Sequence, residues 1–242
     1  MSSISAVLAV GGHAADMEFT AGALIAKYTR AGARAVFLHA TPGEMGHPRL
    51  SGLEYAQQKH EEARRAAEIL GAEARFLPYT DTALPHDDMV AYQIADVIRE
   101  ARPEVVITHW RGSFHSDHIN AHLTTERALF LAALPAITRA HPAHTPSTVL
   151  YPENWEDMDG FDPTLFVDIG DVYEQWLEAA NQYELFRGGV SGFRYREYYQ
   201  ALATMRGCLA GFERAVALMR PKDALIGRFS GLPPVGTPGF VI

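Results

Sequence analysis

Cysteine is nearly absent from this chain, as are the segments that membranes and nucleic acids require. Cys208 is the single cysteine among 242 residues, so no internal disulfide can form, and we expect a buried thiol in the apolar stretch 204–218. No apolar run reaches the roughly 18 residues of a membrane span, and no secretion signal opens the sequence. With a formal net charge of −8 and no lysine or arginine run, nucleic acid is not expected as a partner. These absences predict a cytoplasmic protein that does not bind membranes.

Two common active-site motifs are also missing. The turn after the first apolar run reads V-G-G-H-A-A from Val10 to Ala15, which is not the G-x-G-x-x-G of dinucleotide-binding proteins. The acidic side chain of Asp16 would also face a pyrophosphate unfavourably. No G-x-S-x-G motif is present. The sequence therefore argues against nucleotide binding and against a serine nucleophile.

The composition is that of a globular protein, with 48% hydrophobic and 21% charged residues. Through the first half of the chain, short apolar runs alternate with segments of helical periodicity. The expected strands are 4–10, 35–40, 74–77 and 105–108, and the expected helices are 18–31, 53–70 and 88–101. This alternation predicts an α/β fold of three layers, in which helices cover both faces of a mostly parallel sheet.

The pattern changes after about residue 145. Two short strands and two longer helices are expected there, over 148–151, 165–167, 172–186 and 195–219. A tail rich in glycine and proline follows at 227–242. Because no internal repeat or low-complexity linker interrupts the chain, we expect a single domain over 1–242.

Histidine and aspartate residues gather where two of the predicted strands end. His13 and Asp16 follow the first strand, and His115, Asp117 and His118 follow the fourth. Residues three apart at the start of a helix share a face, and right-handed crossovers bring these strand ends to one edge of the sheet. Open α/β sheets bind ligands at that edge. Two imidazoles and a carboxylate would suit zinc, with a fourth position left open for water.

Each of these segments also has an ordinary interpretation. A lone histidine after a strand is more often a hydrogen-bonded loop residue than a metal ligand, so His13 by itself predicts little. The cluster from His115 to His118 is more informative, because polar side chains beside an apolar strand are costly to bury without a purpose. Together the two segments favour a metal site.

At these positions the sequence resembles the PIG-L-type de-N-acetylases, which remove acetyl or other acyl groups from amino sugars and related amines. The family pattern A-H-P-D-D-x-E reads G-H-A-A-D-M-E at 12–18, T-x-G-E-x-G reads T-P-G-E-M-G at 41–46, and H-P-D-H reads H-S-D-H at 115–118. The three motifs agree in order and spacing over about the first 125 residues. The resemblance implies a Rossmann-like fold, a zinc cofactor, a small acylated amine as substrate, and assembly into a homo-oligomer.

The resemblance also assigns a role to each matching position. His13, Asp16 and His118 match the metal ligands, with Zn²⁺ as the expected ion and another divalent metal as the alternative. His115 matches the histidine that stabilises the tetrahedral oxyanion, and Asp117 matches the carboxylate that orients or tunes it.

A loop after the second predicted strand carries two further candidates, Glu44 and Arg49. In the family this loop helps to form the rim of the substrate site, so the resemblance implies that both residues contact substrate. The alternative is a solvated pair of loop side chains.

Ala15 departs from the family pattern, because it stands where the first aspartate of the Asp-Asp pair acts as general base. Alanine cannot accept a proton, so the usual mechanism cannot run unchanged. One explanation is that metal-bound hydroxide suffices by itself for an activated substrate. Another is that the protein is a catalytically impaired metal- or sugar-binding member of the fold. A third explanation is a substitute base, for which the candidates are Asp117, His115, Glu44 and the acidic segment 153–157. We favour an altered amide hydrolase.

Overall fold

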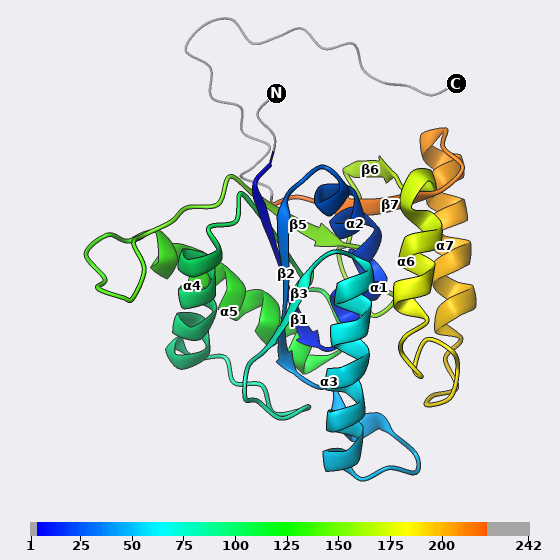
Figure 1. The fold of residues 1–242 in the computed structure, drawn as a ribbon, viewed down its shortest axis with the longest axis horizontal. Coiled ribbons are helices and arrows are strands. Elements are labelled where there is room, and N and C mark those ends of the chain that lie inside the picture. Colours follow the sequence, from blue (N-terminus) through cyan, green and yellow to red (C-terminus); the bar gives the residue numbers. More distant parts are fainter. Residues whose placement is uncertain (1–3, 222–242) are drawn as a thin grey trace, which may run out of the picture.

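The computed structural model describes residues 4–221, and Figure 1 shows how its helices and strands are arranged. The strands are β1 (Ala6–His13), β2 (Arg34–Thr41), β3 (Glu73–Phe76), β4 (Val105–Thr108), β5 (Thr148–Pro152), β6 (Leu165–Asp168) and β7 (Ala215–Met219). The helices are α1 (Asp16–Thr20), α2 (Gly22–Arg30), α3 (Gly52–Ile69), α4 (Asp88–Ala101), α5 (Ser116–Ala133), α6 (Tyr173–Ala180) and α7 (Tyr195–Ala210). Two short 3₁₀ helices are η1 (Glu44–Gly46) and η2 (Gly170–Val172). The tail expected at 227–242 lies outside the described residues.

All seven strands form one sheet, in the order β3-β2-β1-β4-β5-β7-β6. The first five strands in this order are parallel, and β7 runs antiparallel to both β5 and β6. The prediction of an α/β fold with a mostly parallel sheet is therefore confirmed. Because β1 pairs with both β2 and β4, with His13 opposite Thr41 and Val10 opposite Thr108, these three strands end at the same edge of the sheet.

Side chains of the central strand β1 alternate between two hydrophobic cores. Val7 and Ala9 belong to the core under α1, α2, α3, α6 and α7, whereas Leu8 and Val10 belong to the core under α4 and α5. All eight residues of β1 are buried, as expected of a strand that is covered on both faces. Figure 1 shows the two helical layers on opposite sides of the sheet, which gives the three predicted layers.

The helix predicted over 18–31 is in fact two helices, α1 and α2, which meet at Ala21. The indole Nε1 of Trp176 donates a hydrogen bond of 3.0 Å to the carbonyl of Glu18. In a continuous helix that carbonyl would accept the amide of residue 22. A Cβ at Gly22 would also lie 3.0 Å from the Trp176 ring, so a larger residue would have to displace that ring where α6 packs against the break.

The prediction of one helix over 195–219 is wrong in its second half. Helix α7 ends at Ala210, Gly211 follows with a φ of 76°, and the chain returns as strand β7. The helix predicted over 172–186 likewise ends early, at Ala180. A short apolar run fits a buried strand as well as a helix end, and here its pairing with β5 and β6 decides the outcome.

Cys208 is exposed, so the expectation of a buried thiol is also wrong. The buried residues of α7 are Tyr199, Ala203 and Gly207, which lie four residues apart on one face. Cys208 comes one position after that face and points away from the core.

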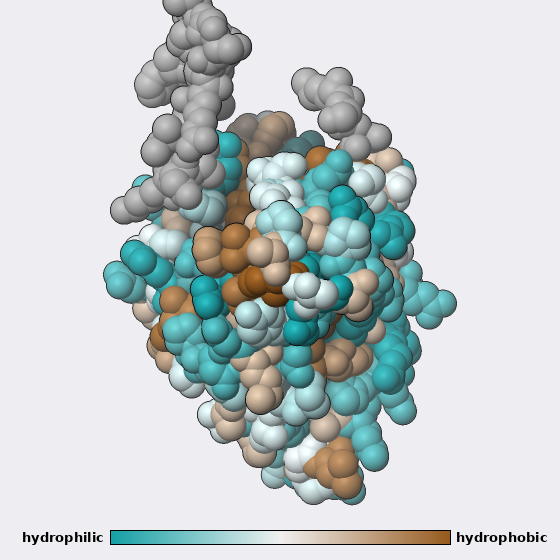
Figure 2. Space-filling view, turned by 90° about the vertical axis from the view of Figure 1, so that its left-hand side faces the viewer, coloured by the Kyte–Doolittle hydropathy of each residue, from teal (hydrophilic) through white to brown (hydrophobic). Residues whose placement is uncertain are grey.

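Among residues 4–221, no helix is both long enough and apolar enough to cross a bilayer. Figure 2 views the side of the molecule that carries α4 and α5, where a small apolar area lies among hydrophilic side chains. Met89 of α4 and Phe130 of α5 are large apolar side chains exposed to solvent.

Candidate metal centre

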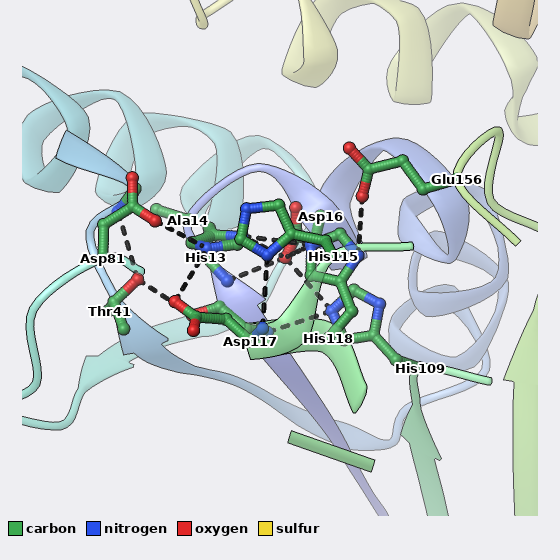
Figure 3. Close-up of polar contacts among 12 residues, drawn as sticks. His13, Ala14, Asp16, Thr41, Asp81, His109, His115, Asp117, His118 and Glu156 are labelled. Carbon is green, nitrogen blue, oxygen red and sulfur yellow. Dashed lines mark hydrogen bonds and ion pairs between the residues drawn. The ribbon is translucent and has the colours of Figure 1, made fainter. Parts of the chain in front are cut away.

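The polar residues predicted from the two strand ends meet at the carboxyl edge of the sheet (Figure 3). His13 is the last residue of β1 and Asp16 the first of α1, whereas His118 lies in the first turn of α5. Gly12 makes this meeting possible, because a Cβ there would lie 3.0 Å from Cδ2 of His118. The absence of a side chain thus lets the end of β1 approach the start of α5.

Three side-chain atoms form a nearly equilateral triangle in this site. His13 Nδ1 lies 3.1 Å from His118 Nε2, and Asp16 Oδ2 lies 3.2 Å from each of these two nitrogens. Ligands placed at about 2.0–2.1 Å in a tetrahedron around zinc are roughly 3.3 Å apart. The donor set and its spacing therefore fit a zinc ion held by three protein ligands, with the fourth position open to the cavity.

Asp16 is the electrostatic centre of this triangle. Its Oδ2 accepts a hydrogen bond of 2.7 Å from the amide of His13 and lies 3.1 Å from His109 Nε2. Burial favours the neutral carboxyl, but the charges of His118 and His13 outweigh it and hold the pKa of Asp16 well below its usual range. Asp16 is thus ionised at neutral pH, which is the state that metal binding would require of it.

The far nitrogen of His13 faces a carboxylate that sequence reasoning missed. His13 Nε2 lies 3.0 Å from Asp81 Oδ1, on the loop after β3, and 3.4 Å from Asp117 Oδ2. Burial raises the pKa of Asp81, but contact with His13 lowers it to about 2. A carboxylate behind a histidine ligand fixes its ring and its tautomer. The only sequence signal for Asp81 is its place after the third predicted strand, at the same sheet edge.

Two more side chains outside the three family motifs contact the site. His109, directly after β4, accepts a hydrogen bond of 3.0 Å at Nε2 from the amide of Gly12. Burial and the charge of His118 lower the pKa of His109 to about 4, so its ring is neutral at pH 7. Glu156, from the acidic segment named as a source of a substitute base, reaches His118 Nδ1 at 2.7 Å.

His115 lies beside the triangle and caps the first turn of α5. Its Nδ1 accepts a hydrogen bond of 3.2 Å from the amide of Asp117, so Nδ1 carries no proton. Burial, together with the charges of His13 and His118, lowers the pKa of His115 below its usual value. A neutral imidazole whose Nδ1 is an acceptor must carry its proton on Nε2. His115 is therefore a hydrogen-bond donor through Nε2, on the wall of the cavity.

The other predicted residues make most of their contacts outside the triangle. The Asp117 carboxylate accepts hydrogen bonds from the amides of Thr82 (2.7 Å) and Leu84 (3.4 Å), so it ties α5 to the loop after β3. Glu44 accepts a hydrogen bond of 3.2 Å from the Asp81 amide, whereas Arg49 is exposed and lies 3.5 Å from Glu184. The roles assigned to these three residues stay predictions.

A cavity of about 170 Å³ opens in front of the triangle. His13, Asp16, His115 and His118 line it together with Tyr55, Lys59, Asp81, Glu156 and Tyr195. Ala15 is buried at the turn into α1 with a φ of 100°, a backbone conformation that residues other than glycine rarely adopt. Ala15 itself packs in the hydrophobic core, and the residue of this turn that lines the cavity is its neighbour Ala14.

Comparisons with known proteins agree with these motifs. Residues 8–129 match the family model PIG-L, described as GlcNAc-PI de-N-acetylase. Diacetylchitobiose deacetylase of Thermococcus kodakarensis is 31% identical over 224 residues, which cover 80% of this chain and 82% of that protein. 4-Oxalmesaconate hydratase of Pseudomonas putida is 26% identical over 216 residues, which cover 84% of this chain and 80% of that protein. The crystal structure of 4-carboxy-2-hydroxymuconate hydratase from Pseudomonas putida superposes with a TM-score of 0.84 and 23% identity, covering 96% of this chain and all of that one.

Proposed function

Because the chain belongs to the PIG-L family of de-N-acetylases, we propose that it is a metal-dependent hydrolase that removes an acyl group from the nitrogen of an amino sugar or related small amine. The observation that carries this proposal is the triangle of His13, Asp16 and His118, with edges of 3.1 and 3.2 Å. When bound there, zinc would supply an activated water and polarise the scissile carbonyl.

The chain's own residues supply two further requirements of amide hydrolysis, a fixed ligand ring and a donor to the oxyanion. Asp81 and Asp117 approach Nε2 of His13, which leaves Nδ1 directed into the triangle. His115 offers its Nε2 proton to the oxygen that becomes negative when water adds to the carbonyl. A neutral ring has no second proton to give away, so the proton that the leaving amine needs must come from the attacking water through another group.

The proposal extends to finer points that the residues favour. Zinc is proposed as the ion because two imidazoles and one carboxylate match its preferred donors. Glu44 and Arg49 are proposed to shape the substrate rim from the loop that carries Gly43 and Gly46, two residues of the cavity wall. A single domain, a cytoplasmic location and a homo-oligomer complete the proposal, the last from the family resemblance.

A second candidate function is the addition of water to a carbon–carbon double bond of a small carboxylate. Two observations favour it. The match to the hydratase relative covers 84% of this chain, and Ala15 stands where the deacetylase pattern has its acid–base aspartate. Both reactions need an activated water in the same cavity, but only amide hydrolysis must also protonate an amine.

Two substrates separate these candidates. We expect the zinc-loaded protein to release acetate from N,N′-diacetylchitobiose, measured enzymatically, and to leave the ultraviolet absorbance of 4-oxalmesaconate unchanged. Loss of that absorbance without acetate release would replace the hydrolase by the hydratase. Zinc binding without turnover of either compound would favour the catalytically impaired binding protein instead.

Restoring the missing carboxylate is expected to speed amide hydrolysis. In Ala15→Asp the new side chain occupies the family's general-base position, and aspartate tolerates a positive φ better than most residues. A general base typically accelerates such a reaction by about 10²–10⁴-fold, so we expect kcat to rise by no more than this factor. Ala15→Asn is the matched control, because it has the same shape but cannot take a proton. Equal rates in the two variants would show that another group already acts as base or that the substrate class is wrong.

A further inference from the structure

We infer that Glu156 is a positioning residue of the metal centre, whose carboxylate accepts the Nδ1 proton of His118 and thereby directs Nε2 of that ring into the ligand triangle. The inference rests on the metal site of the proposed function and adds to it a residue that none of the three motifs contains. Glu156 follows β5 in the sequence and reaches the site from the side opposite Asp81 (Figure 3).

The tautomer of His118 requires an acceptor at Nδ1. A neutral imidazole has one N–H and one lone pair, so a ring that binds a metal through Nε2 must carry its proton on Nδ1. Glu156 Oε2 lies 2.7 Å from this nitrogen, closer than the Ser113 hydroxyl at 3.3 Å. Both His118 and Glu156 are buried, with 2% and 8% of their surface exposed.

The position of the Glu156 carboxylate also lacks another explanation among residues 4–221. Oε2 is shielded from solvent and makes no hydrogen bond within residues 4–221 of this structure, and its short contact is the one of 2.7 Å with His118 Nδ1. A buried carboxylate oxygen without a partner is costly, so its place next to one imidazole nitrogen is informative. Glu153, three residues earlier on the same loop, instead forms its ion pair with Arg206.

The backbone around Glu156 is held before any ligand binds. Its carbonyl accepts a hydrogen bond of 3.1 Å from the amide of Phe114, and Ser113 forms an isolated β-bridge with Asp157. On the other side, the Tyr199 hydroxyl donates to Asn154 Oδ1 at 3.0 Å. The loop after β5 is thus fastened both to the loop that leads into α5 and to α7. A carboxylate on so fixed a loop can orient His118 with little loss of entropy.

The two histidines of the triangle are therefore supported in the same way. Asp81 stands behind His13 at 3.0 Å and Glu156 stands behind His118 at 2.7 Å. Outer partners of this kind change metal affinity by about 10–100-fold when removed. Zinc affinity, rather than turnover, is accordingly the property that Glu156 should control.

The test compares Glu156→Ala, Glu156→Gln and the matched control Glu153→Gln with the natural protein. Zinc dissociation constants are measured by competition with a chromophoric chelator, and the visible spectrum of the Co²⁺ form reports the geometry around the ion. We expect Glu156→Ala to bind zinc about 10–100-fold more weakly and to alter the Co²⁺ spectrum. Glu156→Gln should lose less, because its amide oxygen can still accept the Nδ1 proton, and Glu153→Gln should match the natural protein.

Several results would overturn the inference. The first is an unchanged zinc dissociation constant in Glu156→Ala. The second is a loss of zinc affinity in Glu153→Gln as large as that in Glu156→Ala, which would assign the effect to the loop and not to the Glu156 carboxylate. If Glu156→Ala does not fold, Glu156→Met, which fills a similar space without an acceptor, takes its place, and retention of both zinc affinity and the Co²⁺ spectrum in that variant would refute the inference. A natural protein that binds zinc but hydrolyses no amide would refute the proposed reaction alone, and one that binds no zinc would refute both.

Discussion

Replacing Asp16 by asparagine is expected to remove tight zinc binding and, with it, turnover. The change keeps the size of the side chain but deletes the negative charge at the centre of the triangle. His13 and His118 would then have to hold a dication with no anionic ligand. Loss of an outer partner weakens metal binding by about 10–100-fold, and we expect loss of this ligand to raise the zinc dissociation constant by more than that. Competition with a chelator at fixed pH measures the change.

Asp171→Asn is a suitable control for this variant, because Asp171 forms an ion pair with Lys27 at the surface, away from the sheet edge. It should bind zinc as the natural protein does. If Asp16→Asn also kept the natural affinity, Asp16 would not be a ligand, and the triangle would be a hydrogen-bond network without a metal.

Replacing His115 is expected to leave zinc in place while lowering kcat by about 10²–10³, the usual cost of removing one oxyanion donor. His115 approaches the triangle without belonging to it, since its ring centre lies 4.6 Å from that of His13 and 4.8 Å from that of His118. Its Nε2–H is the group that would stabilise the developing negative charge. Steady-state kinetics on the acylated amine, together with zinc content, measures both parts of the prediction.

Two variants separate catalysis from helix capping at this position. His115 caps α5 through Nδ1, so His115→Ala should also cost about 1 kcal/mol of stability. His115→Asn restores a capping oxygen but has no Nε2 donor, so it should regain the melting temperature and not the rate. Natural kcat in His115→Asn would remove His115 from the mechanism.

The arrangement of the first half of the chain could be predicted because local and long-range signals agree there. Apolar runs alternating with helices dictate parallel strands, and parallel strands place His13, Asp16 and His118 at one edge. In the structure, one side-chain atom of each of these three residues lies 3.1–3.2 Å from the other two. Spacing alone did not show which ring nitrogens face inward, since this depends on Asp81 and Glu156 behind the rings.

Asp81 was missed from the sequence, and Glu156 was named only as part of the acidic segment 153–157, for a physical reason. Asp81 and Glu156 belong to no periodic pattern, and their position depends on where the loops after β3 and β5 turn. Glu156 is fixed by contacts with Phe114 and its neighbours, about 40 residues earlier in the chain. Such tertiary contacts leave no regular spacing in the sequence.

Errors in the second half have the same origin. Strand β7 lies between β5 and β6, out of sequence order, so its pairing partners are 47 or more residues away. The apolar residues of 215–219 continue the hydrophobic composition of α7, and only Gly211 at the end of that helix marked a break. Cys208 was misplaced because a composition window does not tell which face of a helix is buried.

This chain is expected to hold one metal ion through His13, Asp16 and His118. Elemental analysis of the natural protein and of His118→Ala, purified in parallel and supplied with zinc before dialysis, tests it most directly. We predict about one zinc per chain in the natural protein and a large loss in the variant. No metal in the natural protein, or equal zinc in both, would contradict the account.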